Sequence, residues 1–259
     1  MLLVLDVGNS NTVIGVYDMR DKKLMRHWRM TSLRQTSDEV GLLLSNLVRS
    51  ADISPSDIKS AIMSSVVPAL DNQIIEAVKD YFNVDCMKVS IALDLGIEIK
   101  YSVPKELGAD RIVNSVAAVS KYGVGKPIIA IDYGTAIVFD VISKDGAFLG
   151  GVICPGLTTS IEALFGKTAK LPQVALEAPS TVIAQNTIGA IQSGVMYGNA
   201  GMTDKIVAMI KDELGEKECI VIATGGHAEL MSHYAKSIQH VDTWLTLDGL
   251  RVIYERNAR

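Results

Sequence analysis

The sequence predicts an α/β protein made of two similar lobes. Three observations lead to this prediction. The chain has 259 residues, a length that suits two domains at about 150 residues each. Strand-like and helix-like segments alternate along it, which is typical of α/β architecture. One hairpin pattern occurs twice, about half a chain length apart.

The repeated hairpin begins with an apolar strand that ends in Asp-x-Gly. Residues 3–18 read LVLDVGNSNTVIGVYD and residues 129–141 read IAIDYGTAIVFDV, which places Asp6 and Asp132 at equivalent positions. Asp-x-Gly is a common turn signal, so a single copy would mean little. Because the segments on both sides also match, the repeat indicates a duplicated domain rather than a coincidence.

The remaining elements follow from hydrophobic spacing and from helix or turn signals. Ser37 is a candidate N-cap for a helix over 37–50. A buried strand over 60–68 ends at Pro68, and ECIVIATGG at 218–226 reads as a strand followed by a turn. Further helices are expected over 71–82, 105–121, 156–165, 181–214, 227–234 and 244–256.

The stretch YGVGKP, residues 122–127, is the best candidate linker because it is rich in glycine and bounded by proline. We therefore expect an N-terminal lobe over 1–122 and a C-terminal lobe over 127–259.

Composition and residue patterns disfavour several classes of function. A net charge of −4 disfavours electrostatic binding to nucleic acid. No apolar run approaches the roughly 18 residues of a membrane span, and the opening MLLVLDVGNSNT reads as a strand rather than a signal peptide. Cys86, Cys154 and Cys219 are too far apart for a disulfide framework or a metal knuckle. We expect a cytoplasmic protein without nucleic-acid or membrane partners.

The turn after the first strand has the chemistry of a phosphate site. Gly8 lets the backbone turn tightly and lets a bulky anion approach. The four residues after it offer side-chain donors and successive amides: Asn9, Ser10, Asn11 and Thr12. Asp6 needs a bound Mg²⁺ to tolerate phosphate beside it. A plain hairpin with polar turn residues is the alternative, and the second copy shifts the balance towards phosphate.

The common nucleotide-binding motifs are missing. The GKT at 166–168 has Ile161 where a Walker A loop needs glycine, and no G-x-G-x-x-G follows a strand. Any phosphate chemistry must therefore work without a lysine-bearing glycine loop.

Two further motifs point to a nucleotide and an acidic substrate. ATGG, residues 223–226, would let a flat ligand such as adenosine lie on exposed backbone; a plain strand-to-helix turn is the alternative for this first motif. In GADR, residues 108–111, Arg111 offers a planar fork for a carboxylate and Asp110 is a candidate base for a hydroxyl. A helix-capping Asp beside a solvated Arg is the alternative for the second motif.

Taken together, these motifs resemble those of the type III pantothenate kinases, which belong to the superfamily of acetate kinases, sugar kinases and actin. The resemblance covers nearly the whole chain. Its anchors are DVGNSNTVIGVYD at 6–18, HWR at 27–29, SSVVP at 64–68, GADRIVN at 108–114, IDYGTA at 131–136, GGVICPGL at 150–157, NTIGAIQSG at 186–194 and ATGG at 223–226.

The resemblance implies a fold and a reaction. The lobes would be actin-like, or ribonuclease H-like, each a mixed sheet flanked by helices, with a cleft between them. The reaction would be the ATP-dependent phosphorylation of pantothenate to 4'-phosphopantothenate, the first step of coenzyme A biosynthesis, by direct in-line transfer. Members of the family are typically homodimers and typically require K⁺ or NH₄⁺ in addition to Mg²⁺.

The resemblance also implies roles for individual residues. Asp110 would be the catalytic base, and Asp132 would ligate the monovalent cation. ATP would be bound by Asp6, Val7, Gly8, Asn9, Ser10, Asn11, Thr12, Val13 and Thr135. Pantothenate would be bound by Tyr101, Gly108, Ala109, Asp110, Arg111 and Thr187.

The chain departs from the family pattern at a few positions. Ser10 stands where members often have Thr, which keeps the hydroxyl. Ile137 and Val138 replace two threonines near the expected cation site, and alternation along a strand means that only one of them can face it.

Two rival functions stay open at this point. One is a phosphohydrolase of the exopolyphosphatase type, which begins with a similar strand and turn. The other is a catalytically silent homologue that regulates transcription. GADR and ATGG favour the kinase over the first rival, and the retained acids and the acidic composition argue against the second.

Overall fold

The structure is a computed structural model that describes residues 1–167 and 171–258, so Thr168 of the GKT stretch lies outside the described residues. The chain forms two compact units. Unit 1 contains Met1–Glu98, Ser102–Lys121 and the chain from Leu245 onward. Unit 2 contains Ile99–Tyr101 and Tyr122–Trp244.

Unit 1 is a five-stranded mixed sheet with the strand order β3-β2-β1-β4-β5. Its strands are β1 (Leu2–Val7), β2 (Asn11–Asp18), β3 (Lys23–Thr31), β4 (Ser60–Ser65) and β5 (Cys86–Lys88). Its helices are α1 (Ser37–Arg49), α2 (Pro68–Phe82), α3 (Ala109–Tyr122) and α7 (Leu245–Asn257), with short 3₁₀ turns at Pro55–Asp57 and Pro104–Glu106.

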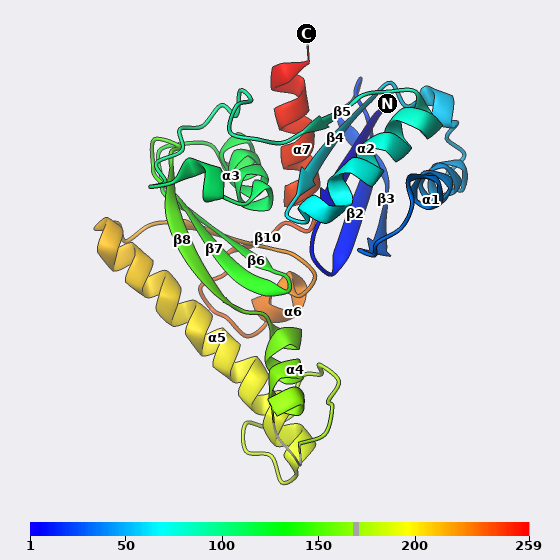
Figure 1. The fold of residues 1–259 in the computed structure, drawn as a ribbon. Coiled ribbons are helices and arrows are strands. Elements are labelled where there is room, and N and C mark those ends of the chain that lie inside the picture. The colour runs from blue at the N-terminus through cyan, green and yellow to red at the C-terminus, as the bar shows by residue number, and fades with distance from the viewer. Residues whose placement is uncertain (168–170, 259) are drawn as a thin grey trace. The chain divides into compact units, whose positions relative to one another are not determined.

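The two faces of the unit 1 sheet differ in what covers them. On β1, alternate residues Leu3, Leu5 and Val7 enter a core shared with α1 and α2. Asp6 points to the opposite face because side chains alternate along a strand. On that face α7 packs against β1, β2 and β4, and Figure 1 shows α7 and α2 on either side of these strands.

Unit 2 repeats this topology with the order β8-β7-β6-β9-β10. Its strands are β6 (Ile128–Tyr133), β7 (Ala136–Ile142), β8 (Phe148–Pro155), β9 (Ile220–Thr224) and β10 (His240–Val241). Its helices are α4 (Leu157–Lys167), α5 (Thr187–Leu214) and α6 (Ala228–Ser232), which share one core with the sheet. Figure 1 shows the long α5 beside α4.

Both sheets join their strands in the same way. The first three strands of each unit are antiparallel neighbours, and the fourth and fifth add in parallel on the other side of the first. The predicted α/β fold with two mixed sheets, each flanked by helices, is therefore confirmed. The expected cleft between the lobes stays a prediction.

The observed units differ in two respects from lobes over 1–122 and 127–259. Ile99–Tyr101 belongs to unit 2, and the last helix, α7, belongs to unit 1. A Cβ on Gly15 of β2 would lie 3.0 Å from Leu247, and one on Gly249 would overlap the carbonyl oxygen of Val113 in α3. This close packing attaches α7 to unit 1. Hydrophobic periodicity in the sequence could not predict it, because periodicity does not show which unit a helix packs on.

Two local expectations also need correction. The N-cap of α1 is Thr36, not Ser37, because the Thr36 hydroxyl accepts from the N–H of Glu39 and the Glu39 carboxylate accepts from the N–H of Thr36. This reciprocal pair satisfies two helix-end donors at once. Residues 181–186 are not helical, because Asn186 caps α5 through the N–H of Gly189 at 2.8 Å.

Among the described helices none is long and apolar enough to cross a membrane.

We predict that Gly249→Ala lowers the free energy of unfolding by about 2 kcal/mol, because a methyl group there overlaps the α3 backbone and forces an overpacked contact. Chemical denaturation monitored by circular dichroism measures the change. The matched control is Gly201→Ala in α5, where a Cβ meets nothing within 4 Å. Alanine should leave that helix as stable or more stable. Equal effects of the two variants would contradict the close packing of α7 on unit 1.

Candidate active site

The turn between β1 and β2 in unit 1 is tight and tied to β3. The N–H of Gly8 donates to the carbonyl oxygen of Asn11 at 3.0 Å, and a Cβ on Gly8 would lie 3.0 Å from that same oxygen. The N–H of Ser32 donates to the carbonyl oxygen of Ser10 at 3.1 Å. Asn9, Ser10 and Asn11 are exposed. The turn is therefore a rigid support that presents polar side chains to solvent or to a ligand.

Thr12 supports this turn from within the fold. Its side chain is 2% exposed, and its hydroxyl lies 2.9 Å from the hydroxyl of Ser32. Because the Thr12 hydroxyl already forms this hydrogen bond, its first role is to hold the turn in place.

Asp6 stands in a row of side chains that crosses the sheet. It pairs with Val13 on β2 and with Ser64 on β4, and directly paired residues point to the same face. Ser64 is fully buried, and its hydroxyl has no hydrogen-bond partner among the described residues. Ser64 was not among the residues predicted from the sequence. The feature that could have indicated it is the hydroxyl near the end of the buried strand, in SSVVP at 64–68.

Asp110 lies in the first turn of α3 and folds back over Gly108. The N–H of Arg111 donates to its Oδ1 at 2.8 Å, and a Cβ on Gly108 would be 2.5 Å from that oxygen. Burial raises the pKa of the Asp110 carboxyl above its usual 3.8, against the opposing effect of that hydrogen bond and of the Arg111 charge. A desolvated carboxylate with a raised pKa is suited to accept a proton.

The Asp110 loop lies at the same end of the unit 1 sheet as the polar turn. A Cβ on Gly108 would lie 3.7 Å from Val66, which follows β4. The N–H of Val66 in turn donates to the carbonyl oxygen of Val7, the last residue of β1, at 3.1 Å. The candidate base and the candidate phosphate turn thus share the carboxyl ends of β1 and β4. Arg111 beside them is 8% exposed.

In unit 2, Asp132 lies against the ATGG turn. Gly225 has φ +91°, and a Cβ there would overlap Oδ1 of Asp132 and lie 2.8 Å from the backbone nitrogen of Tyr133. The N–H of His227 donates to the carbonyl oxygen of Tyr133 at 3.2 Å. Two motifs that are far apart in sequence are therefore in backbone contact, and only glycine fits at position 225.

The Asp132 row repeats the Asp6 row. Asp132 pairs with Val138 on β7 and with Thr224 on β9, whose side chain is 1% exposed. Val138 thus shares the face of Asp132, whereas Ile137 is fully buried in the core on the opposite face. Of the two departures from the family pattern, only Val138 adjoins Asp132.

Thr135 belongs to a second tight turn, against which the residues at the start of α4 pack closely. Its side chain is exposed, and its carbonyl oxygen accepts from the N–H of Gly156 at 3.1 Å and from the Thr159 hydroxyl at 2.7 Å. The turn after β6 is therefore held by the start of α4, as the turn after β1 is held by the end of β3.

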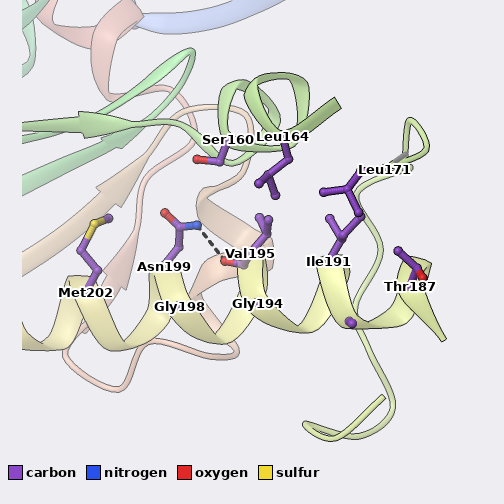
Figure 2. A pocket seen from close by; sticks show the side chains of 11 residues that line it. Ser160, Leu164, Leu171, Thr187, Ile191, Gly194, Val195, Gly198, Asn199 and Met202 are labelled. Carbon is purple, nitrogen blue, oxygen red and sulfur yellow. Dashed lines mark hydrogen bonds between the residues drawn. The ribbon is translucent and has the colours of Figure 1, made fainter. Parts of the chain in front are cut away.

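The two remaining predicted substrate residues lie elsewhere in unit 2. The Tyr101 ring packs against Phe148, with centroids 5.9 Å apart. Thr187 begins α5 and lines a cavity of about 550 Å³ between α4 and α5, together with Ser160, Leu164, Ile191 and Asn199 (Figure 2). Sequence reasoning missed this cavity, because it arises from helix packing.

The structure thus assembles the predicted residues into separate groups. Asp6–Val13 and Gly108–Arg111 share one end of unit 1, and Asp132, Thr135 and the ATGG turn share one end of the unit 2 sheet. No group of three or more His, Cys, Asp or Glu side chains within the described ranges is arranged to hold a metal. A divalent ion at Asp6 would depend on substrate phosphate oxygens and water, as Mg²⁺ commonly does.

Fold and candidate site together define an actin-like α/β protein: two sheets of equal topology, each with an acid at the end of its central strand and a tight turn after it. Solved structures share this fold. One is the putative Baf family transcriptional activator from Campylobacter jejuni, with a TM-score of 0.59 and 21% identity over 98% of each chain. Another is the inorganic polyphosphate/ATP-glucomannokinase from Arthrobacter sp. strain KM, with a TM-score of 0.53 and 12% identity over 99% of this chain and 98% of that one.

The chain belongs to the type III pantothenate kinase family, whose sequence profile matches residues 2–209. A type III pantothenate kinase from Citrifermentans bemidjiense is 46% identical over 258 residues, which cover 99% of this chain and 100% of that protein. Family membership confirms the resemblance inferred from the motifs, and it favours the kinase over the phosphohydrolase and the silent regulator.

We predict that Gly225→Ala lowers the free energy of unfolding by about 2 kcal/mol more than Gly123→Ala. Both glycines have a positive φ, +91° and +79°, so both variants carry similar backbone strain. A Cβ on Gly123 meets nothing within 4 Å, whereas one on Gly225 overlaps Asp132. Paired urea titrations measure the difference. If the two variants lose equal stability, the ATGG turn does not press on Asp132.

Proposed function

We propose that this protein, a kinase of the type III pantothenate kinase family, transfers the terminal phosphoryl group of ATP to the primary hydroxyl of pantothenate with Asp110 as the base. The observation that carries the proposal is the position of Asp110, a buried carboxylate at the same end of the unit 1 sheet as the polar turn after β1. Phosphoryl transfer needs an acceptor for the hydroxyl proton, alignment and charge neutralisation.

The ATP phosphates would lie on the turn after β1. Asn9, Ser10 and Asn11 present exposed donors there, and the hydrogen bonds of Gly8 and Ser32 keep the turn rigid. Asp6 faces the same end of the sheet and would hold the divalent metal that accompanies ATP. When bound, that ion supplies charge neutralisation at the phosphates. Val7 and Val13 flank Asp6 in the hairpin and position it by their strand pairing.

Pantothenate would be held by groups suited to its carboxylate and its uncharged body. Arg111 offers the bidentate guanidinium for the carboxylate. Gly108 and Ala109 form the loop that brings Asp110 towards the hydroxyl. Tyr101 and Thr187 would contact the rest of the substrate, as the family resemblance implies, and the mostly apolar cavity beside Thr187 suits an uncharged group.

Asp132 would ligate a monovalent cation, K⁺ or NH₄⁺. A single carboxylate beside the glycine backbone of the ATGG turn and the Thr224 hydroxyl forms an oxygen-rich, weakly charged site. Its single negative charge matches the single positive charge of such an ion. Val138 contributes no oxygen on the other side of Asp132. Thr135, at the next turn, would contact ATP.

The functional unit would be a cytoplasmic homodimer. Several large apolar side chains near the cavity are exposed, with fractions from 38% to 85%: Leu164, Phe165, Val182, Ile183 and Ile188. An exposed apolar surface of this kind is typical of a subunit interface, and a second copy would cover it.

We predict that purified protein with Mg-ATP and pantothenate releases ADP and forms phosphopantothenate only when both substrates are present. K⁺ should support higher turnover than the same concentration of Na⁺, because K⁺ or NH₄⁺ is the ion proposed at Asp132. A coupled ADP assay with mass spectrometry of the product measures both effects. Phosphate release that is independent of pantothenate would instead favour the phosphohydrolase.

We predict that Asp110→Asn lowers kcat by about 100-fold or more while both Michaelis constants stay within a few-fold, because only the proton acceptor is lost. In the wild type, activity should fall as the pH drops through a pKa above the usual 3.8, since the base must be ionised. The variant should lack this acid limb.

Stability gives an independent check on the same carboxyl. A raised pKa means that the folded state prefers the protonated form, so wild-type stability falls as the pH rises through that pKa. Asp110→Asn should remove this loss and be the more stable protein at pH 8. Near-normal turnover, or an unchanged pH profile, would rule out Asp110 as the base.

A further inference from the structure

The HWR motif on β3 has no role in the reaction as described so far, and the sheet register places it near the polar turn. Trp28 and Met30 pack against the α1–α2 core of unit 1. Arg29 lies between them in sequence, so its side chain points to the opposite face, the one that carries Asp6. Arg29 is exposed, and its side chain makes no hydrogen bond or ion pair within the described ranges.

Arg29 continues the row of side chains that contains Asp6. It pairs with Val13 on β2, and Val13 pairs with Asp6 on β1. Two strand spacings, about 10 Å, therefore separate the backbones of Arg29 and Asp6. Two residues further along β3, Thr31 pairs with Asn11 of the turn itself. From this position a long arginine side chain can reach the phosphates expected at the turn.

The hydrogen bonds that fix the turn also fix β3. Ser32, directly after β3, binds the Ser10 carbonyl through its N–H and the Thr12 hydroxyl through its own hydroxyl. The distance from Arg29 to the turn is therefore set by two cross-links rather than by a mobile loop.

The charge balance of the site favours a cation here. Asp6 and Asp110 are acids, the nucleotide phosphates are strongly anionic, and the chain has no Walker lysine. His27, on the same face, has its pKa lowered, first by burial and then by the charges of Arg26 and Arg29. The lowered pKa favours the neutral imidazole, whereas the guanidinium of Arg29 on that face is always charged.

Unit 2 shows that the fold itself does not need an arginine at this position. The corresponding row there runs from Asp132 through Val138 to Ile153 on β8. Ile153 is 62% exposed and carries no charge. The cation is thus present only in the unit that bears the polar turn.

We propose that Arg29 binds the terminal phosphate oxygens of the nucleotide held at the turn after β1, an inference that rests on the proposed function. Arginine suits this task because its planar fork can bind two phosphate oxygens at once. Arg29 is a nucleotide-binding residue in this assignment and takes no part in proton transfer.

The test compares Arg29→Gln with Arg26→Gln. Arg26 is exposed on the same strand but pairs with Val16, which faces the α1–α2 core, so its side chain lies on the other face. Arg29→Gln should raise the Michaelis constant for ATP by about ten-fold or more, as expected for a lost charge-assisted hydrogen bond. The constant for pantothenate should stay within about twofold, and Arg26→Gln should leave both constants within about twofold.

Inorganic tripolyphosphate serves as a probe of the phosphate contacts alone. Its inhibition constant should rise by a similar factor in Arg29→Gln, whereas inhibition by adenosine should not change. Arg29→Lys, which keeps the charge but loses the fork, should fall between wild type and Arg29→Gln. Circular dichroism and thermal melting establish that each variant is folded.

The outcomes separate this inference from the proposed function. If the wild type phosphorylates pantothenate and Arg29→Gln behaves like Arg26→Gln, the role of Arg29 is overturned and the function stands. If the wild type does not phosphorylate pantothenate, the proposed function fails. Calorimetric titration of the same variants with Mg-ATP then decides on Arg29: a loss of affinity confined to Arg29→Gln supports its role, and equal affinities overturn it.

Discussion

The site depends on a backbone constraint that occurs in both units: an acid at the end of the central strand must be followed by a tight turn against which other backbone packs closely. Gly8 meets this constraint in unit 1, where its N–H closes the turn onto Asn11. In unit 2 the close packing comes from a different segment of the chain: Gly225 of the ATGG turn lies against Asp132 and the Tyr133 backbone. A side chain at Gly225 would overlap the Asp132 carboxylate, and one at Gly8 would crowd the Asn11 carbonyl oxygen that closes the turn.

A protein that binds an anionic nucleotide beside acidic side chains must offset the repulsion between these negative charges. The net charge of −4 cannot do so, so individual side chains near the turn must. Asp110 is desolvated, which raises its pKa and suits a base. Arg111 and, as we infer, Arg29 supply positive charge beside the turn without a glycine loop that carries a lysine. Each cation lies on an element whose position is fixed by hydrogen bonds or close packing, so little order has to be gained on binding.

Much of this could be predicted from the sequence, and the reason is periodicity. Alternating apolar residues predict strands, and apolar residues at helical spacing predict helices. A repeated Asp-x-Gly in matching surroundings predicts two related lobes. The predicted residues of the turn and of GADR do share one end of unit 1. Ser64 and Thr224, which flank the two acids, could not be assigned to them, because parallel pairing joins strands that are distant in the sequence.

By itself, the sequence determined the chemical types at each turn, the duplicated α/β pattern and the family, because these depend on local order along the chain. Only the tertiary structure decided that α7 completes unit 1, that the ATGG turn lies on Asp132, that α4 and α5 enclose a cavity, and that Arg29 shares a face with Asp6. These facts depend on strand register and on side-chain shape across long sequence separations. A one-residue shift in the pairing of β3 would turn Arg29 away from the face of Asp6.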